Sequence, residues 1–139
     1  MTKFEQFTFN EEHLTTIKAG ILLFNSEKFW ECHEELEHHW LEARGDNIRL
    51  IYWAIIQVAA CLYHVRKENL VGAKGLHKKS LDKLDRCEKN HIESILLDKS
   101  ISWSQFKKTV RNIKLNPKLK DFNTLYRFKF RTPAKWSDE

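Results

Sequence analysis

Residues 29–40 form the densest group of side chains in this sequence that could carry out chemistry. The stretch, FWECHEELEHHW, holds three histidines and four carboxylates among two tryptophans and a phenylalanine. Charged groups rarely lie among large aromatic side chains unless they are paired, hydrogen-bonded or bound to a ligand. The stretch is therefore the first candidate for a binding or catalytic site.

The spacing within this stretch predicts a helix with separate faces. The apolar stripe that should face the core consists of Phe29, Cys32, Leu36 and Trp40. His33 and Glu37 lie one turn apart on the adjacent flank, which we expect to be half-buried. At that spacing a carboxylate can orient the imidazole ring and raise its basicity.

A matching line of residues is predicted on the next helix, at steps of three or four. It consists of Trp53, Gln57, Ala60 and His64. If the two helices form an antiparallel hairpin, the two lines face each other. The candidate site therefore comprises His33, Glu34, Glu37, Gln57 and His64.

Several kinds of chemistry are open to these five residues. Histidines and carboxylates that converge are typical ligands of a divalent metal, with an amide such as that of Gln57 supporting them. The same groups could bind a small ligand, or form a buried hydrogen-bond network that fixes helix register without any ligand. The pattern Glu35-x-x-His38 occurs once on this helix and faces outward, and His33-Glu34 lacks the second histidine of a zinc protease. Neither pattern specifies a reaction, so the question of enzymatic activity stays open here.

The composition predicts an all-α cytoplasmic protein. Four glycines and two prolines in 139 residues favour long helices, and three dispersed cysteines are typical of buried thiols in a reducing compartment. The N-terminus has no apolar signal-peptide core. The most apolar run, residues 50–65, is shorter than the ~20 residues that a membrane span needs. We therefore expect no association with a membrane.

Helix boundaries follow from caps and breaks in the apolar pattern. The first predicted helix begins after Asn10 and ends near residue 25. The second has Ser26 as its candidate N-cap, covers residues 27–44 and stops at Gly45, and the third runs from Asp46 or Asn47 to about residue 67. Two more cover residues 70–89 and a segment from Ser102 or Ser104 to 116. The segment 90–100 is ambiguous. Links of two or three residues make neighbouring helices antiparallel, so we expect five or six helices around an antiparallel three-helix core. The predicted helical domain is 1–116, and 117–139 is an irregular basic C-terminal arm, packed on the body or partly flexible.

The end of the chain carries an excess of basic residues. Residues 105–139 contain ten Lys or Arg against three Asp or Glu, and residues 126–131 alternate aromatic with basic side chains. Such alternation can stack bases and contact phosphates. The nucleic-acid candidates are Lys107, Lys108, Arg111, Lys114, Arg127, Lys129 and Arg131. An arm with docked aromatic rings and solvated charges is favoured, because no recognised nucleic-acid fold surrounds these residues.

Several separated motifs resemble, in order and spacing, the DUF309 family of small bacterial and archaeal helical proteins. They are Leu23-Phe24-Asn25, the pattern within 29–40, Ile55-Ile56-Gln57-Val58-Ala59-Ala60, His64, Asn69 and Gly72-Ala73. The resemblance covers roughly residues 10–85 and implies an all-helical fold with a polar set matching the five candidate residues. The family has no established biochemical activity. His77 falls where relatives are expected to have an apolar residue, and the basic tail lies outside the pattern.

The sequence thus supports two functions of different class. The first is an uncharacterised small helical protein with a site for a metal or small ligand between its second and third helices. The second is a non-enzymatic interaction protein, in which the polar cluster is structural and the basic tail contacts an acidic partner or nucleic acid. A helical fold does not choose between them, and self-association is compatible with both.

Overall fold

The computed structural model describes residues 8–42 and 47–136 of the chain. The described residues form helices and connecting segments and contain no strand, so the predicted all-α class is confirmed. The helices are α1 (Glu11–Asn25), α2 (Phe29–Glu42), α3 (Arg49–Arg66), α4 (Leu70–Lys89), α5 (Ile95–Ile101), α6 (Trp103–Arg111), the 3-10 helix η2 (Leu119–Phe122) and α7 (Asn123–Arg127).

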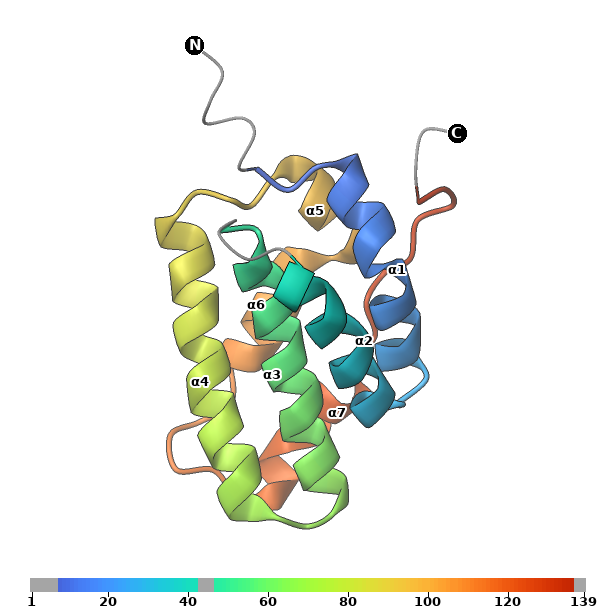
Figure 1. The fold of residues 1–139 in the computed structure, drawn as a ribbon. Coiled ribbons are helices and arrows are strands. Elements are labelled where there is room, and N and C mark those ends of the chain that lie inside the picture. The colour runs from blue at the N-terminus through green and yellow to red at the C-terminus, as the bar shows by residue number, and fades with distance from the viewer. Residues whose placement is uncertain (1–7, 43–46, 137–139) are drawn as a thin grey trace.

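Helix α3 is the central element of the core. Twelve of its residues are buried, and it packs between α2 and α4, which lie on either side of it in Figure 1. Ring contacts join Trp30 of α2 to Tyr63 of α3, and Trp40 of α2 to Trp53 of α3, so the two helices run in opposite directions. The predicted antiparallel three-helix core is confirmed. None of the described helices is both long and apolar enough to cross a membrane.

Local capping chemistry sets the starts of α1 and α4 as predicted. The side-chain oxygen of Asn10 accepts hydrogen bonds from the backbone N–H groups of Glu12 and His13, at 2.9 and 3.3 Å. Asn69 accepts in the same way from Gly72 at 3.0 Å. These bonds satisfy N–H groups that lack a partner within the first helical turn.

The start of α2 corrects the sequence analysis. Ser26 was expected to belong to the entry into the second helix, yet it closes α1, with its Oγ donating to the carbonyl oxygen of Leu22 at 3.0 Å. Glu27 then takes a left-handed backbone conformation with φ of 60°, and α2 begins only at Phe29. The reversal is completed by Lys28, whose N–H donates to the carbonyl oxygen of Leu23. Such a turn ends one helix before the next begins.

Two other helix boundaries also differ from those predicted. Helix α3 begins at Arg49, after Ile48 rather than at residues 46 or 47. The ambiguous segment 90–100 contains most of α5, which Ser94 caps through a bond from the N–H of Leu97. The predicted stop at Gly45, the start at Asp46 and the end of the second helix at Arg44 lie outside the described residues.

The last part of the chain is more ordered than the irregular arm that the sequence predicted. It contains η2 and α7, followed by an extended segment that runs alongside α1 in Figure 1. Phe130 in this segment is buried, and its ring contacts those of Phe24 and Phe106 at 4.9 and 4.8 Å. The Asn25 side chain holds the Phe130 backbone with two hydrogen bonds, at 2.8 and 2.9 Å. The division into residues 1–116 and 117–139 stays a prediction.

Candidate functional site

The five candidate residues lie on two adjacent helices, as predicted, but differ in exposure. His33, Glu34 and Glu37 belong to α2, whereas Gln57 and His64 belong to α3. Gln57 is only 7% exposed, the two histidines are half-buried, and the two carboxylates are exposed. The amide of Gln57 therefore lies deep between the helices, and the carboxylates lie at the surface.

The ring of His33 is held by aromatic contacts. It stacks on the indole of Trp30, with 5.0 Å between ring centroids and an interplanar angle of 15°, and Trp30 in turn contacts Tyr63 at 5.2 Å. The Nδ1 atom of His33 is buried and has no hydrogen-bond partner among the described residues. The stack fixes the ring and leaves one of its nitrogen atoms unsatisfied.

Two further buried polar atoms on the same helix pair lack a partner. They are Oε1 of Gln57 and Nε1 of Trp40; with Nδ1 of His33 they are the unpartnered buried side-chain atoms of the described residues. Sequence analysis placed Trp40 on the apolar stripe, and its spacing gave no indication that the indole N–H would be unsatisfied. An unpaired buried polar group costs roughly 1–3 kcal/mol, so three on one helix pair are unusual.

His64 points toward the turn between α3 and α4. Its Nδ1 lies 3.2 Å from Nδ2 of Asn69, the residue that caps α4. The ring packs closely on Gly72, where a Cβ atom would lie 2.9 Å from Cγ and Nδ1 of His64. No hydrogen bond joins His33, Glu34, Glu37, Gln57 and His64 to one another in the described chain, so the expected hydrogen-bond network is not formed.

The structure gives no support for the expected metal site. Across residues 8–42 and 47–136, no three His, Cys, Asp or Glu side chains are grouped so that they could hold a metal ion. The carboxylate closest to a histidine on α2 belongs to Glu35, which lies 2.9 Å from Nε2 of His39, outside the candidate set. That pair is an ordinary i,i+4 contact on one helix.

Cations pack on the tryptophans at the other end of the α2–α3 contact. The rings of Trp40 and Trp53 lie 5.1 Å apart, and the guanidinium of Arg49 is 4.0 Å from the Trp40 ring. Nζ of Lys83, from α4, lies 4.3 Å from the Trp53 ring, although the Lys83 side chain is only 8% exposed. The sequence analysis missed this cluster because Lys83 and Arg49 come from different helices. Such contacts hold a cation beside an aromatic face at little cost in solvation.

Residues of α2, α3 and α4 form three stripes with the same helical spacing, which we call the three-helix face. The stripes are Trp30, Glu34, Glu37 and Leu41 on α2; Trp53, Gln57, Ala60 and His64 on α3; and Gly72, Leu76, Lys79 and Lys83 on α4. The ring contacts between α2 and α3, and the contacts of α4 with His64 and Trp53, fix their register. Glu37, Gln57 and Lys79 consequently lie at the same level.

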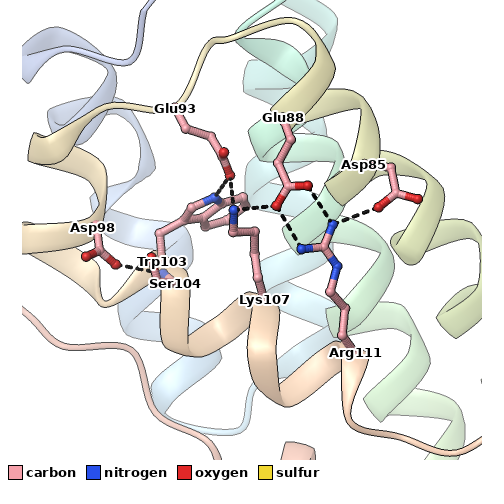
Figure 2. A network of polar contacts seen from close by, with 8 residues as sticks. All are labelled: Asp85, Glu88, Glu93, Asp98, Trp103, Ser104, Lys107 and Arg111. Carbon is pink, nitrogen blue, oxygen red and sulfur yellow. Dashed lines mark hydrogen bonds and ion pairs between the residues drawn. The ribbon is translucent and has the colours of Figure 1, made fainter.

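The basic residues expected near nucleic acid are largely paired within the protein. Figure 2 shows Lys107 between Glu88 and Glu93, at 2.7 and 2.8 Å, and Arg111 against Glu88 and Asp85, both at 2.7 Å. Further pairings involve other members of the set: Lys114 with Asp121, Lys129 with Glu27, and Arg131 with the carbonyl oxygen of Lys99. Lys108 and Arg127 are exposed. The contacts support a docked arm, and the nucleic-acid interpretation gains no support from them.

Glu88 makes part of the stability of this ion-pair network dependent on pH. Hydrogen bonds from Arg111 and Lys107 lower the pKa of Glu88 from 4.5 to about 2. Because the folded-state pKa is the lower one, the network stabilises the fold fully above pH 4.5 and loses this contribution as the pH falls toward 2.

We therefore expect acid to destabilise wild type more steeply than Glu88→Gln over this range. The matched control is Glu34→Gln, which removes an exposed carboxylate outside the network and should leave the wild-type slope unchanged. Urea unfolding at a series of pH values measures both. Equal slopes for wild type and Glu88→Gln would contradict the lowered pKa.

The three cysteines and His77 are buried. All three cysteines are free and buried, and burial raises the pKa of each thiol to about 12. His77 is buried, with Nε2 2.8 Å from the carbonyl oxygen of Val110. Its imidazole thus has a hydrogen-bond partner inside the core. A buried thiol that stays protonated is a poor nucleophile.

The fold and the three-helix face define a small all-α protein with a polar, aromatic-flanked surface and no recognisable metal centre among its described residues. Residues 17–76 match the family model described as a domain of unknown function (DUF309). Over this segment the chain is therefore similar to the DUF309 family, as its motifs indicated.

A curated protein is also similar to part of the chain. It is the uncharacterized protein YpuF of Bacillus subtilis (strain 168), 36% identical over 70 residues, which are 50% of this chain and 40% of the relative. The match thus spans less than half of the relative's length. No solved structure matches the chain. The family segment ends at residue 76, so Lys79 and Lys83 of the three-helix face lie beyond it.

Proposed function

We propose that this protein is a non-catalytic interaction module that binds a partner through the three-helix face. The observation that carries the proposal is the group of unpartnered buried atoms at the α2–α3 contact that supports this face: Nδ1 of His33, Nε1 of Trp40 and Oε1 of Gln57. Nearly all buried polar atoms in native proteins have a hydrogen-bond partner. A cost in stability that is concentrated at one place is typical of a functional surface.

The surroundings of these atoms also favour binding. Trp30 is 46% exposed and Leu41 is 48% exposed, at the two ends of the α2 stripe. Large side chains of this kind anchor interfaces when a partner covers them, and tryptophan is especially frequent among such anchors. Between them, Glu34 and Glu37 are exposed and form no ion pair with another described residue.

The other functions considered have less support. Metal-dependent chemistry would need converging ligands, and fewer than three candidate ligands come together in the described parts of the chain. Binding through the basic tail would need free cations, whereas Lys107 and Arg111 are engaged by Glu88. The three-helix face, by contrast, presents exposed apolar side chains, Trp30 and Leu41, beside exposed carboxylates.

The stability of Gln57→Met tests the proposal. Methionine has a similar shape and removes the unpaired acceptor, so the free energy of unfolding should rise by about 1 kcal/mol. The measurement is urea unfolding at a protein concentration at which the protein is a monomer. Association then does not contribute to the measured stability.

Ser80→Ala is the matched control for this measurement. Ser80 is also buried, but its Oγ donates to the carbonyl oxygen of His77 at 2.7 Å, so its removal should destabilise the protein. The two variants should therefore change stability in opposite directions. If Gln57→Met destabilises the protein as Ser80→Ala does, the amide has a structural partner and the proposal fails.

A further inference from the structure

We propose that a cavity beside α4 binds a small organic anion, namely a carboxylate that carries a short hydrocarbon chain. The cavity lies between α4 and the segment that follows α6, and Figure 1 shows that segment looping beside α4. We call it the α4 cavity. The inference goes beyond the interaction function proposed above and does not depend on it.

The α4 cavity and the three-helix face lie on different flanks of α4. Lys74 and Lys78 line the cavity, whereas Leu76 and Lys79 belong to the face. At 3.6 residues per turn the two pairs lie about half a turn apart, and the buried stripe that includes Leu84 separates them. A ligand in the cavity therefore leaves the three-helix face uncovered.

The lining of the α4 cavity is positively charged. It includes Lys74, Lys78 and Lys114, and none of the lining residues is acidic. Nζ of Lys74 donates to Oδ1 of Asn116 at 2.7 Å, and this neutral partner leaves the charge of the lysine uncompensated. Lys78 forms no hydrogen bond or ion pair with another described residue. Lys114 lies 3.6 Å from a carboxylate oxygen of Asp121, which is not part of the lining. A cavity lined by one sign of charge attracts a ligand of the opposite sign.

The rest of the lining is largely apolar. Leu81 and Ile113 are half-buried there, whereas Leu115 is 93% exposed. An inorganic anion would leave these side chains in contact with water. A carboxylate with a hydrocarbon chain would place its charge among the lysines and its chain against the leucines and Ile113, so it fits both parts of the lining.

Hydrogen bonds connect the two sides of the α4 cavity. His77, which lines it from α4, donates from Nε2 to the carbonyl oxygen of Val110 on α6 at 2.8 Å. On the other side, Asn116 has a left-handed backbone conformation with φ of 53°, which asparagine adopts more readily than most residues, and accepts the bond from Lys74. The cavity is thus formed before a ligand enters, which lowers the cost of binding.

The size of the α4 cavity limits the ligand. Its volume is about 280 Å³, close to the lower limit of about 300 Å³ for ligand cavities in proteins. A short chain therefore suits it better than a long one. A ligand of this size makes few contacts, so we expect a dissociation constant of about 1 mM.

Hexanoate is the probe for the first experiment. Titration of the ¹⁵N-labelled protein, followed by NMR, should show saturable shifts at residues of the cavity such as Lys78 and Leu115. Hexan-1-ol has the same chain without the charge, and inorganic phosphate has charge without a chain. Both should bind at least about tenfold more weakly than hexanoate. Added sodium chloride should weaken the binding of hexanoate and leave that of hexan-1-ol unchanged.

Substitutions test which residues bind the probe. Lys74→Gln combined with Lys78→Gln should raise the dissociation constant of hexanoate at least about tenfold, because both cations are removed. Leu115→Ser should also raise it, and this side chain is too exposed to contribute much to the fold. The matched control is Lys89→Gln, the same change at an exposed position near the end of α4, which should have no effect. Urea unfolding of each variant shows whether its fold is intact.

Four results would overturn the inference. The first is the absence of saturable shifts with hexanoate, and the second is a set of shifts that lies outside the α4 cavity. The third is equal affinity for hexanoate and hexan-1-ol or phosphate, which would mean that charge and chain are not recognised together. The fourth is an unchanged dissociation constant in the folded double variant. None of these results bears on the three-helix face, whose test is the stability of Gln57→Met.

Discussion

Replacing Phe130 with alanine is expected to lower the free energy of unfolding by about 3–5 kcal/mol. Its ring is buried against Phe24 and Phe106, and its backbone is held by the side chain of Asn25. Truncation would leave a cavity between α1, α6 and the C-terminal segment. Urea unfolding measures the loss through the midpoint and the slope of the transition.

Two further variants control this prediction. Phe130→Leu keeps most of the apolar volume and should cost clearly less than Phe130→Ala. Thr132→Ala changes an exposed residue of the same segment and should alter stability by no more than about 0.5 kcal/mol. A loss for Phe130→Ala as small as that for Thr132→Ala would mean that the segment detaches readily and contributes little to the core.

Replacing Ile55 with alanine should cost about 2–5 kcal/mol, the second large effect. Ile55 is fully buried in α3, the helix that packs against both α2 and α4. The cost combines the lost transfer of the removed methyl groups out of water with the cavity that remains. Chemical unfolding of the monomer measures it.

The same site allows a graded control. Ile55→Val removes a single methyl group and should cost about 0.5–1.5 kcal/mol, between wild type and the alanine variant. An unfolding midpoint that scarcely moves in Ile55→Ala would show that this side of α3 is not the packed one. The face assigned to Gln57 would then be wrong as well.

Local chemistry explains which elements could be predicted. The bounds of α4 follow the sequence closely because Asn69 caps its first turn and the apolar pattern continues to its end. Asn10 defines α1 for the same reason. By contrast, a serine such as Ser26 can either begin one helix as its N-cap or close the preceding helix by donating to a backbone carbonyl group. Which of the two occurs depends on the backbone group that its hydroxyl reaches. In this structure the Ser26 hydroxyl reaches the carbonyl oxygen of Leu22, so Ser26 ends α1.

The sequence predicted which faces of α2 and α3 meet, but not the contacts made there. Helical spacing correctly places the polar lines of α2 and α3 side by side, because spacing determines the face on which a residue lies. It does not determine rotamers, so the turn of His64 toward Asn69 was not foreseen. The cations beside Trp53 were missed because Lys83 reaches it from another helix.

The contact between Asn25 and Phe130 joins positions 105 residues apart, and it has a consequence for the growing polypeptide during translation. Helices α2, α3 and α4 contact their sequence neighbours, so they can assemble while synthesis continues. At about 5–20 residues per second, the ribosome adds the residues between the end of α4 and Phe130 in roughly 2–8 s. During that interval Phe24 has no cover from Phe130, and a nascent chain that stalls there presents an apolar surface to chaperones.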